Sequence, residues 1–476
     1  MSPALLADLR QVLRDEQIRT EPLELALYGR DASLMSGKTV VACLPETGDE
    51  VAAIVDVCAR HDRPFVARGS GTGLAGGAVP IGDPVVIVTT RLNRILEVDL
   101  DNGVAWVEPG VLNLDLSRAL AVHGVHFAPD PSSQQVCSIG GNVANNSGGP
   151  HCLAYGVTTA HIVVLDVVLP DGTVTRLGGL DPEPPGYDLR GVFVGSEGTL
   201  GVAVRIAVRL TPVAPAVATL LVDYADVGAG AATVSGIIAA GLVPAALEMM
   251  DRPAIQMVEA FVHAGYPTDA AAVLLVELDG LPAGVAAAVD DVSRIATENG
   301  ARSVRVAADE AERALLWKGR KNAFGAVARI RPDYYLHDTV VPRTRLVEVL
   351  DEVYRIAARY DLVVVNVFHA GDGNLHPILA FDGSDAGVLE RVHRAGREIV
   401  EASLAAGGVL SGEHGIGLEK RDYMPLMFSA ADLAAQDRLR SVFDPENLAN
   451  PTKIIPDGSR CGDLAGLRPF PEGAWA

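Results

Sequence analysis

Cysteine is scarce in this chain, and its placement argues against two classes of protein. The 476 residues contain five cysteines, Cys43, Cys58, Cys137, Cys152 and Cys461. They form no C-x-x-C pair and no even framework of the kind that secreted domains use. The spacing therefore predicts a protein of the reducing cytoplasm that carries no iron–sulfur cluster of its own.

Positive charge is also in short supply. Lys and Arg total 39 against 60 Asp and Glu, a net charge of −21. A surface of this sign repels nucleic acid and anionic lipid, so we expect no nucleic-acid partner. It repels an anionic metabolite as well. A site for such a metabolite must therefore concentrate positive charge locally, through Arg, Lys or a metal ion.

A long apolar run is missing too. The most apolar uncharged stretch, residues 227–247, is broken by Gly236, Gly241 and Pro244 among others, which favours a helix followed by a strand over a membrane span. The first 17 residues carry Asp8 and Arg10 where a signal peptide needs an apolar segment. We expect no export signal.

Hydrophobic periodicity predicts an α+β protein of at least two domains, as a chain of this length requires. Residues 48–61 place Val51, Ile54, Val55 and Cys58 on one helical face, and short apolar runs that follow predict a sheet extending to about residue 212. Strands then alternate with amphipathic helices, such as 287–300 and 345–360, which favours an antiparallel sheet. The expected divisions are a helical segment at 1–37, domains at 38–215 and 216–425, and a tail at 426–476 that returns to the first domain.

The stretch Gly71-Thr72-Gly73-Leu74-Ala75-Gly76 matches the G-x-G-x-x-G pattern of dinucleotide-binding proteins. A Rossmann loop must open a helix, but here Pro80 and Pro84 intervene and the next apolar run predicts a strand. Two interpretations stay open. The loop at 68–73 is either a structural turn or a nest of backbone N–H groups that binds an anion.

Two more glycine-rich stretches follow, at residues 138–149 and 195–201. Glycine lets the backbone approach a ligand closely, and the interspersed Ser, Thr and Asn offer hydrogen bonds. Three such loops in one domain predict a single long, extended ligand.

The motifs RGSGTGLAGGA, PDPSSQQVCSIGGNVANNSGG and GSEGTLG resemble the FAD domain of the vanillyl-alcohol oxidase superfamily, also called the PCMH type. LWKGRKNAFGA, FHAGDGNLHP, SGEHGIGLEK and NPTKIIP are similar to the FAD-linked D subunits of glycolate oxidase and to D-lactate and D-2-hydroxyglutarate dehydrogenases. The resemblance spans residues 38–456. It implies a two-part FAD-binding domain followed by an antiparallel-sheet substrate domain, the FAD-linked oxidase C-terminal domain.

The resemblance also implies how FAD is held. Covalent relatives carry a histidine in the first loop, where this chain has Thr72, so we expect FAD to be bound without a covalent link. The residues expected to bind FAD are Arg68, Gly69, Ser70, Gly71, Thr72, Gly73, Pro129, Ser132, Ser138, Gly141, Asn142, Gly148, Gly195, Glu197, Gly198 and Asn450.

Residues 363–379 predict a hairpin with Asp372-Gly373 as a two-residue type I′ turn. This register places His369 opposite His376, with Cβ atoms roughly 4.5–5.5 Å apart. Two imidazoles at that distance can share a metal ion, or can simply be hydrogen-bonded histidines in a polar sheet.

Glu413 and His414 favour the metal interpretation, because the surrounding glycines allow both side chains to be aimed into one site. His369, His376 and Glu413 would form a set of ligands that suits Zn²⁺ and also admits Fe²⁺, Mn²⁺ or Co²⁺. The dehydrogenase relatives imply the same ligands.

The resemblance alone assigns Arg320, in the basic stretch 317–321, to the substrate carboxylate. The predicted reaction oxidises glycolate or D-lactate: the metal binds the substrate hydroxyl and carboxylate, His414 removes the hydroxyl proton, and hydride passes from C2 to flavin N5. A carbanion route stays open.

Two alternatives remain. A D-2-hydroxyglutarate dehydrogenase would need a further cation, for which Lys321, Arg329 or Arg331 could serve. A catalytically silent flavin subunit would lack a complete set of metal ligands and base. The resemblance further implies a second FAD-binding subunit and an iron–sulfur subunit, with electrons delivered to membrane quinone, and hence at most peripheral association with the inner face of the cell membrane.

Overall fold

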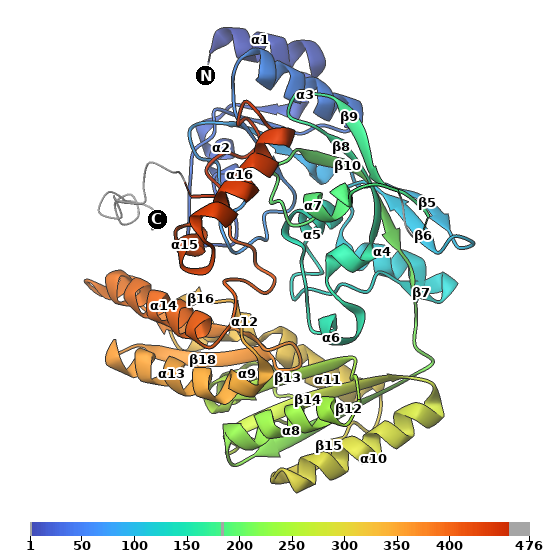
Figure 1. The fold of residues 1–476 in the computed structure, drawn as a ribbon, viewed down its shortest axis with the longest axis vertical. Helices are drawn as coiled ribbons and strands as arrows, with labels where there is room; N and C mark the ends of the chain where they lie inside the picture. Colours follow the sequence, from blue (N-terminus) through green and yellow to red (C-terminus); the bar gives the residue numbers. More distant parts are fainter. Residues whose placement is uncertain (1, 182–184, 457–476) are drawn as a thin grey trace. The chain divides into compact units, whose positions relative to one another are not determined.

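The computed structural model describes residues 2–181 and 185–456 (Figure 1). Cys461 and the rest of the expected tail beyond residue 456 lie outside the described residues. The chain divides into two compact units. Unit 1 is formed by the described parts of Met1–Gly148, Val157–Val213 and Glu413–Ala476, and unit 2 by Gly149–Gly156 and Ala214–Gly412.

Unit 1 begins with a small sheet in the order β1-β2-β4-β3, in which β4 runs parallel to both β2 and β3. Thr47 caps the helix α3 by accepting a hydrogen bond from the Glu50 N–H. The predicted apolar face of α3 is completely buried, which confirms its periodicity. The elements are α1 (Pro3–Val12), β1 (Ile18–Arg19), α2 (Pro22–Tyr28), β2 (Val41–Cys43), α3 (Gly48–Arg60), β3 (Phe65–Arg68) and β4 (Val85–Val88).

A second, antiparallel sheet follows in the order β5-β6-β10-β8-β9. The apolar runs were therefore correctly predicted as strands, but they form two main sheets where one was expected. The elements are β5 (Ile95–Asp99), β6 (Val104–Val107), α4 (Asn113–Leu120), β7 (Val125–His126), α5 (Ile139–Asn145), β8 (Ile162–Val168), β9 (Val174–Gly178), α7 (Leu189–Phe193), β10 (Val202–Arg209) and β11 (Thr211–Pro212), which pairs with β7.

The C-terminal part of unit 1 packs on its N-terminal part. Helices α15 (Met424–Met427) and α16 (Ala430–Phe443) are drawn in red among blue N-terminal elements in Figure 1. Phe443 packs against the core of the second sheet. Ala449 forms a parallel bridge with Phe65, and the Asn450 N–H donates to the Phe65 carbonyl at 2.7 Å. The polypeptide after α16 thus pairs with β3, the edge strand of the first sheet.

Unit 2 contains an antiparallel sheet in the order β15-β12-β14-β13-β18-β19-β17, with β20 pairing β18 and β16, as the sequence predicted. The helices α8, α10 and α13 pack along it (Figure 1). Both predicted amphipathic helices are present, as α10 and α13. The strands are β12 (Ala216–Tyr224), β13 (Ala246–Asp251), β14 (Ala272–Gly280), β15 (Ala301–Val306), β16 (Asp333–Leu336), β17 (Thr339–Val340), β18 (Val363–His369), β19 (Asn374–Leu375) and β20 (Pro377–Phe381).

The helices of unit 2 include one that the sequence did not place there. Residues 149–156, embedded in the sequence of unit 1, contribute the short helix α6 to unit 2. Its Leu153 lies against Leu247 of β13, and the Tyr155 hydroxyl donates to Asp279 of β14. The helices are α6 (Cys152–Tyr155), α8 (Val227–Ala239), α9 (Arg252–Val262), α10 (Pro282–Glu298), α11 (Glu310–Lys321), α12 (Ala323–Ala326), α13 (Leu346–Arg359) and α14 (Val388–Ala405).

Residues 227–247 form α8 followed by β13, as expected. Within the described ranges, no helix combines the length and the apolar character that crossing a membrane requires.

Candidate active site

The three glycine-rich loops come together in unit 1. A Cβ added at Gly69 of the first loop would overlap Ser138 of the second. The third loop is tied to the second by two backbone hydrogen bonds of 2.8 Å, from Gly195 to Val143 and from Glu197 to Ala144. Three segments far apart in the sequence therefore line one region, as a single extended ligand would require.

The first loop is not a Rossmann loop. No helix lies between β3 and β4, and these two strands are parallel neighbours. Gly71 has φ +72°, and the Arg68 guanidinium folds over it so closely that a Cβ would overlap it. Glycine is favoured here by the backbone conformation, which L side chains rarely adopt.

The second loop opens α5, where Ser138 caps the helix by accepting a hydrogen bond from the Gly141 N–H at 3.3 Å. Gly140 and Gly141 differ in their surroundings. A Cβ at Gly140 would lie 2.6 Å from Pro109, whereas a Cβ at Gly141 would meet only the Ser138 hydroxyl, at 3.3 Å. Gly140 is thus required by packing, while space remains beside Gly141.

Two buried polar atoms, one in the third loop and one on α4 beside the second loop, lack partners among the described residues. The Ser196 hydroxyl and the Asn113 Oδ1 are buried and make no hydrogen bond with any residue that the structure describes. Asn113 is fixed through its Nδ2, which donates to the Pro129 carbonyl and to Asn142. Open space beside glycine and buried unpaired oxygens fit a polar ligand such as FAD. Ser132, in contrast, is exposed.

Glu197 and Lys453 are buried ionisable groups beside these loops. Burial raises the pKa of Glu197 to about 7, and burial lowers the pKa of Lys453 to about 8. Lys453 donates to the Val79 carbonyl at 2.7 Å, and Asn450 Nδ2 donates to the carbonyls of Gly77 and Glu197. Residues 450–453 therefore connect the segment just after the first loop to the third loop through hydrogen bonds.

In unit 2, the hairpin that carries the two histidines has a different register from the predicted one. His369 pairs with Asn374, and the turn between β18 and β19 spans residues 370–373. The predicted type I′ turn needs positive φ at both central residues, but Gly373 has it and Asp372 does not. The prediction that His369 and His376 lie directly opposite each other was wrong.

The histidines nevertheless meet, because a displacement of two residues leaves every side chain on the same face of the sheet. His376 becomes a diagonal neighbour of His369. Both side chains are buried, and their ring centroids lie 5.1 Å apart.

Glu248, which the sequence analysis did not single out, connects two of the predicted site residues. This fully buried carboxylate of β13 lies opposite His369 in the sheet. Its Oε1 is 2.6 Å from His369 Nδ1, and its Oε2 is 2.5 Å from Nη2 of Arg320 on α11. A glutamate within the apolar strand ALEMMD was the available signal, since carboxylates are seldom buried without a partner.

Arg320 is 1% exposed, yet its guanidinium nitrogens make no hydrogen bond with any of the described residues. Its pairing with Glu248 is close in distance but lacks hydrogen-bond geometry. Leaving buried donors unsatisfied is costly, and guanidinium suits bidentate binding of a carboxylate. The arrangement fits an anionic ligand at Arg320.

The end of unit 2 lies against the histidine hairpin. Asp338 accepts hydrogen bonds from the Ser411 hydroxyl at 2.6 Å and from the Gly412 N–H at 3.0 Å. A Cβ at Gly412 would overlap the side chain of Asn374, the residue paired with His369. Glu413 follows directly in the chain, and His414 Nε2 is 3.9 Å from Glu413 Oε1.

The sequence offered three cations for the distal carboxylate of D-2-hydroxyglutarate, and two of them are exposed. Arg329 is exposed with its guanidinium over the Phe261 ring, and Arg331 is also exposed. Lys321 is half-buried, with its amine 6.0 Å from the Trp317 ring centroid. Arg329 and Arg331 do not join the buried group around Arg320.

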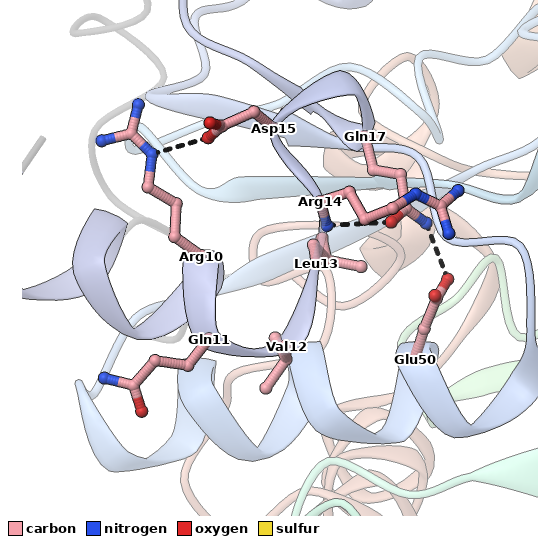
Figure 2. Close-up of a pocket in the computed structure, with 8 residues that line it drawn as sticks. All are labelled: Arg10, Gln11, Val12, Leu13, Arg14, Asp15, Gln17 and Glu50. Carbon is pink, nitrogen blue, oxygen red and sulfur yellow. Dashed lines mark hydrogen bonds and ion pairs between the residues drawn. The ribbon is translucent and has the colours of Figure 1, made fainter.

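A surface hollow at the end of α1 contains none of the predicted site residues (Figure 2). Gln17 bridges it by donating to Glu50 at 2.8 Å, and Arg10 pairs with Asp15. The hollow is lined by Arg10, Gln11, Val12, Leu13, Arg14, Asp15, Gln17 and Glu50.

A mixed fold with three converging glycine-rich loops and a buried His–Glu–Arg group defines a flavin-dependent oxidoreductase. Residues 40–178 match the FAD binding domain family, and residues 213–454 match the C-terminal domain of FAD linked oxidases. The chain belongs to the FAD-linked oxidases.

Individual relatives agree with this assignment. The chain is 43% identical to glycolate oxidase subunit GlcD of Escherichia coli (strain K12), with 98% of this chain and 95% of that protein covered. It is 32% identical to a D-lactate dehydrogenase of Anaerostipes hadrus over 90% of this chain and 91% of that protein. The family resemblance seen in the sequence is confirmed.

The fold is confirmed by a solved structure, 4-ethylphenol oxidase from Gulosibacter chungangensis. It superposes with a TM-score of 0.80 over 97% of this chain and 99% of that chain, at 17% sequence identity. Identity this low supports the architecture alone.

Proposed function

We propose that this protein oxidises a small 2-hydroxy acid, glycolate or D-lactate, to the 2-oxo acid with FAD as the electron acceptor. The observation that carries the proposal is the buried, hydrogen-bond-deficient guanidinium of Arg320, a site for one carboxylate. The names of the glycolate oxidase and D-lactate dehydrogenase relatives support the same substrate class. The exposure of Arg329 and Arg331 favours a substrate without a distal carboxylate.

FAD is held, in this proposal, by the loops at 68–73, 138–149 and 195–201 together with Asn450, and without a covalent link at Thr72. The convergence of the loops and the space beside Gly141 support it. The proposal keeps the domain limits expected from the sequence, with an FAD-binding domain at 38–215 and a substrate domain at 216–425.

A divalent metal, zinc by preference, would be held by His369, His376 and Glu413. The hydrogen bond between His369 Nδ1 and Glu248 is the arrangement by which a carboxylate orients a metal-binding histidine, with Nε2 on the opposite side of the ring. Gly412, whose N–H donates to Asp338 and which lies beside Asn374, directly precedes Glu413 in the chain. A metal cation would add to Arg320 the local positive charge that an anionic substrate needs in a protein of net charge −21.

Arg320 binds the substrate carboxylate in this mechanism, and His414 removes the proton from the substrate hydroxyl. A bound metal would supply Lewis acidity that lowers the pKa of that hydroxyl, and FAD would supply the hydride acceptor. Glu248 holds the orientation of both His369 and Arg320.

Electrons would leave through partner subunits, because the relatives named glycolate oxidase subunit are parts of a complex. A second FAD-binding subunit and an iron–sulfur subunit are our specific proposal, with a cytoplasmic location peripheral to the membrane.

The test is stopped-flow flavin bleaching by glycolate, D-lactate, L-lactate and D-2-hydroxyglutarate. We expect glycolate or D-lactate to bleach the flavin faster than the other two. Elemental analysis should find about one metal ion per chain, lost in a His369→Ala, His376→Ala double variant that keeps its FAD. If no 2-hydroxy acid bleached a flavin that dithionite reduces, the silent-subunit alternative would be correct.

A further inference from the structure

The segment at residues 413–421, called here the 413–421 loop, is attached to all three glycine-rich loops. Asn145 Nδ2 of the second loop donates to the His414 carbonyl at 3.1 Å. Glu197 of the third loop accepts a hydrogen bond from the Ile416 N–H at 2.7 Å. The Ala75 carbonyl of the first loop accepts from the N–H groups of Leu418 and Glu419, at 2.9 and 3.1 Å.

Among the residues that bind the 413–421 loop, Glu197 has an unfavourable backbone conformation for a non-glycine residue. Its φ is +51°, in a loop where Gly195 and Gly198 also have positive φ. A non-glycine residue in this conformation costs roughly 1 kcal/mol or more, so glycine would suit the backbone better. The side chain must therefore account for glutamate at this position.

The contact of that side chain is with the backbone immediately after His414. Glu197 is buried, its Oε1 accepts the Ile416 N–H, and Gly415 is packed against it. A Cβ at Gly415, where φ is +88°, would lie 2.7 Å from Glu197 Oε1. Glu197 and Gly415 fit each other only with this backbone path, and that path sets the direction of Glu413 and His414.

We propose that Glu197 is a positioning residue that holds the 413–421 loop on the flavin-binding loops and so aims Glu413 and His414. The proposal rests on the function proposed above for those two residues. In this proposal, Glu413 and His414 are positioned correctly only when the glycine-rich loops are themselves well ordered. Flavin loading and metal retention are then coupled through unit 1.

The first test is amide hydrogen exchange of the FAD-loaded protein, followed in peptides that cover residues 413–421. Glu197→Ala removes the acceptor of the Ile416 N–H, and Gly415→Ala displaces the same contact without changing a predicted flavin-binding residue. Both should speed exchange at Ile416 by roughly tenfold, the effect of losing one hydrogen bond. Glu197→Gln keeps an acceptor oxygen and should keep the protection. The exposed Glu446→Ala serves as the matched control.

The second test separates positioning from folding. Gly415→Ala should retain its FAD but lose metal and reduce its flavin more slowly, with kcat lowered more than KM is raised. Wild-type exchange in both Glu197→Ala and Gly415→Ala would overturn the proposal. Because exchange needs no substrate, this result is distinct from failure of the proposed function, in which the wild-type flavin would not respond to any 2-hydroxy acid.

Discussion

The two units hold their candidate functional residues in opposite ways. Unit 1 relies mainly on backbone: glycines bring three loops together, and its buried polar atoms without a hydrogen-bond partner among the described residues include the Ser196 hydroxyl and the Asn113 Oδ1. Unit 2 uses charged side chains buried in a sheet, where Glu248 of β13 contacts both His369 of β18 and Arg320 of α11. The first design depends on the absence of Cβ atoms, and the second depends on pairing of charges that burial would otherwise penalise.

A second buried carboxylate shows that the design of unit 2 is general. Glu277 of β14 accepts two hydrogen bonds of 3.0 Å from Arg313, one of 2.8 Å from Thr219 and one from the Trp317 indole. His151 lies 3.1 Å away. Glu277 thereby joins the segment 149–156 to α11, the helix that carries Arg320.

The largest effect is expected in unit 1, from a side chain that fills the space beside Gly141. Gly141→Leu should abolish FAD binding, measured as flavin absorbance after gel filtration, because the side chain would occupy the space that we assign to the ligand. Gly284→Leu, a glycine of α10 with open space around it, is the control that should keep its flavin. In the control and wild-type proteins, acid precipitation should release FAD. A yellow Gly141→Leu protein would contradict the assignment.

The next largest effect concerns the chemistry. His414→Ala should slow flavin reduction by ~10²- to 10⁴-fold, the usual loss when a general base is removed. Arg320→Ala should instead act mainly through a raised KM, since it removes a binding contact. Metal content must be measured on the same samples, because Glu413 is adjacent. A metal-replete His414→Ala enzyme that bleaches at the wild-type rate would exclude His414 from the mechanism.

Glu248→Gln tests the role of the buried ion pair between Glu248 and Arg320 in unit 2. It leaves the buried Arg320 without its counter-charge, which should lower the free energy of unfolding by about 3–5 kcal/mol, and it should weaken metal binding by roughly 10–100-fold. Chemical denaturation and metal titration check the two effects. Replacing both Glu248 and Arg320 by leucine should restore much of the stability but not the activity. Equal stability of Glu248→Gln and wild type would show that the pair is not a structural requirement.

The smallest expected effect is pH-dependent. Burial tends to raise the pKa of Glu277, but hydrogen bonds from His151 and Arg313 outweigh it and lower the pKa to about 2, from the usual 4.5. The ionised carboxylate therefore contributes about 3 kcal/mol above pH 4.5, and this contribution is lost as pH falls toward 2. Glu277→Gln should unfold at a lower temperature than wild type at pH 7, and the gap should narrow between pH 4.5 and pH 2. A constant gap would contradict this assignment.

The sequence by itself determined the local features. The apolar face of α3, the antiparallel strands of unit 2, and helices α10 and α13 followed from periodicity, which is a property of neighbouring residues. The three glycine-rich loops were recognised for the same reason. The predicted FAD ligands, metal ligands and base stay predictions.

Tertiary structure decided the rest. The register of the histidine hairpin depends on β17, whose neighbour Val341 donates to the Gly373 carbonyl and leaves no room for a Cβ there. Glu248 and His369 are 121 positions apart in the chain, and Glu197 and Ile416 are 219 apart. No local pattern reports such pairs, because a buried charge becomes tolerable only when the folded chain supplies its partner.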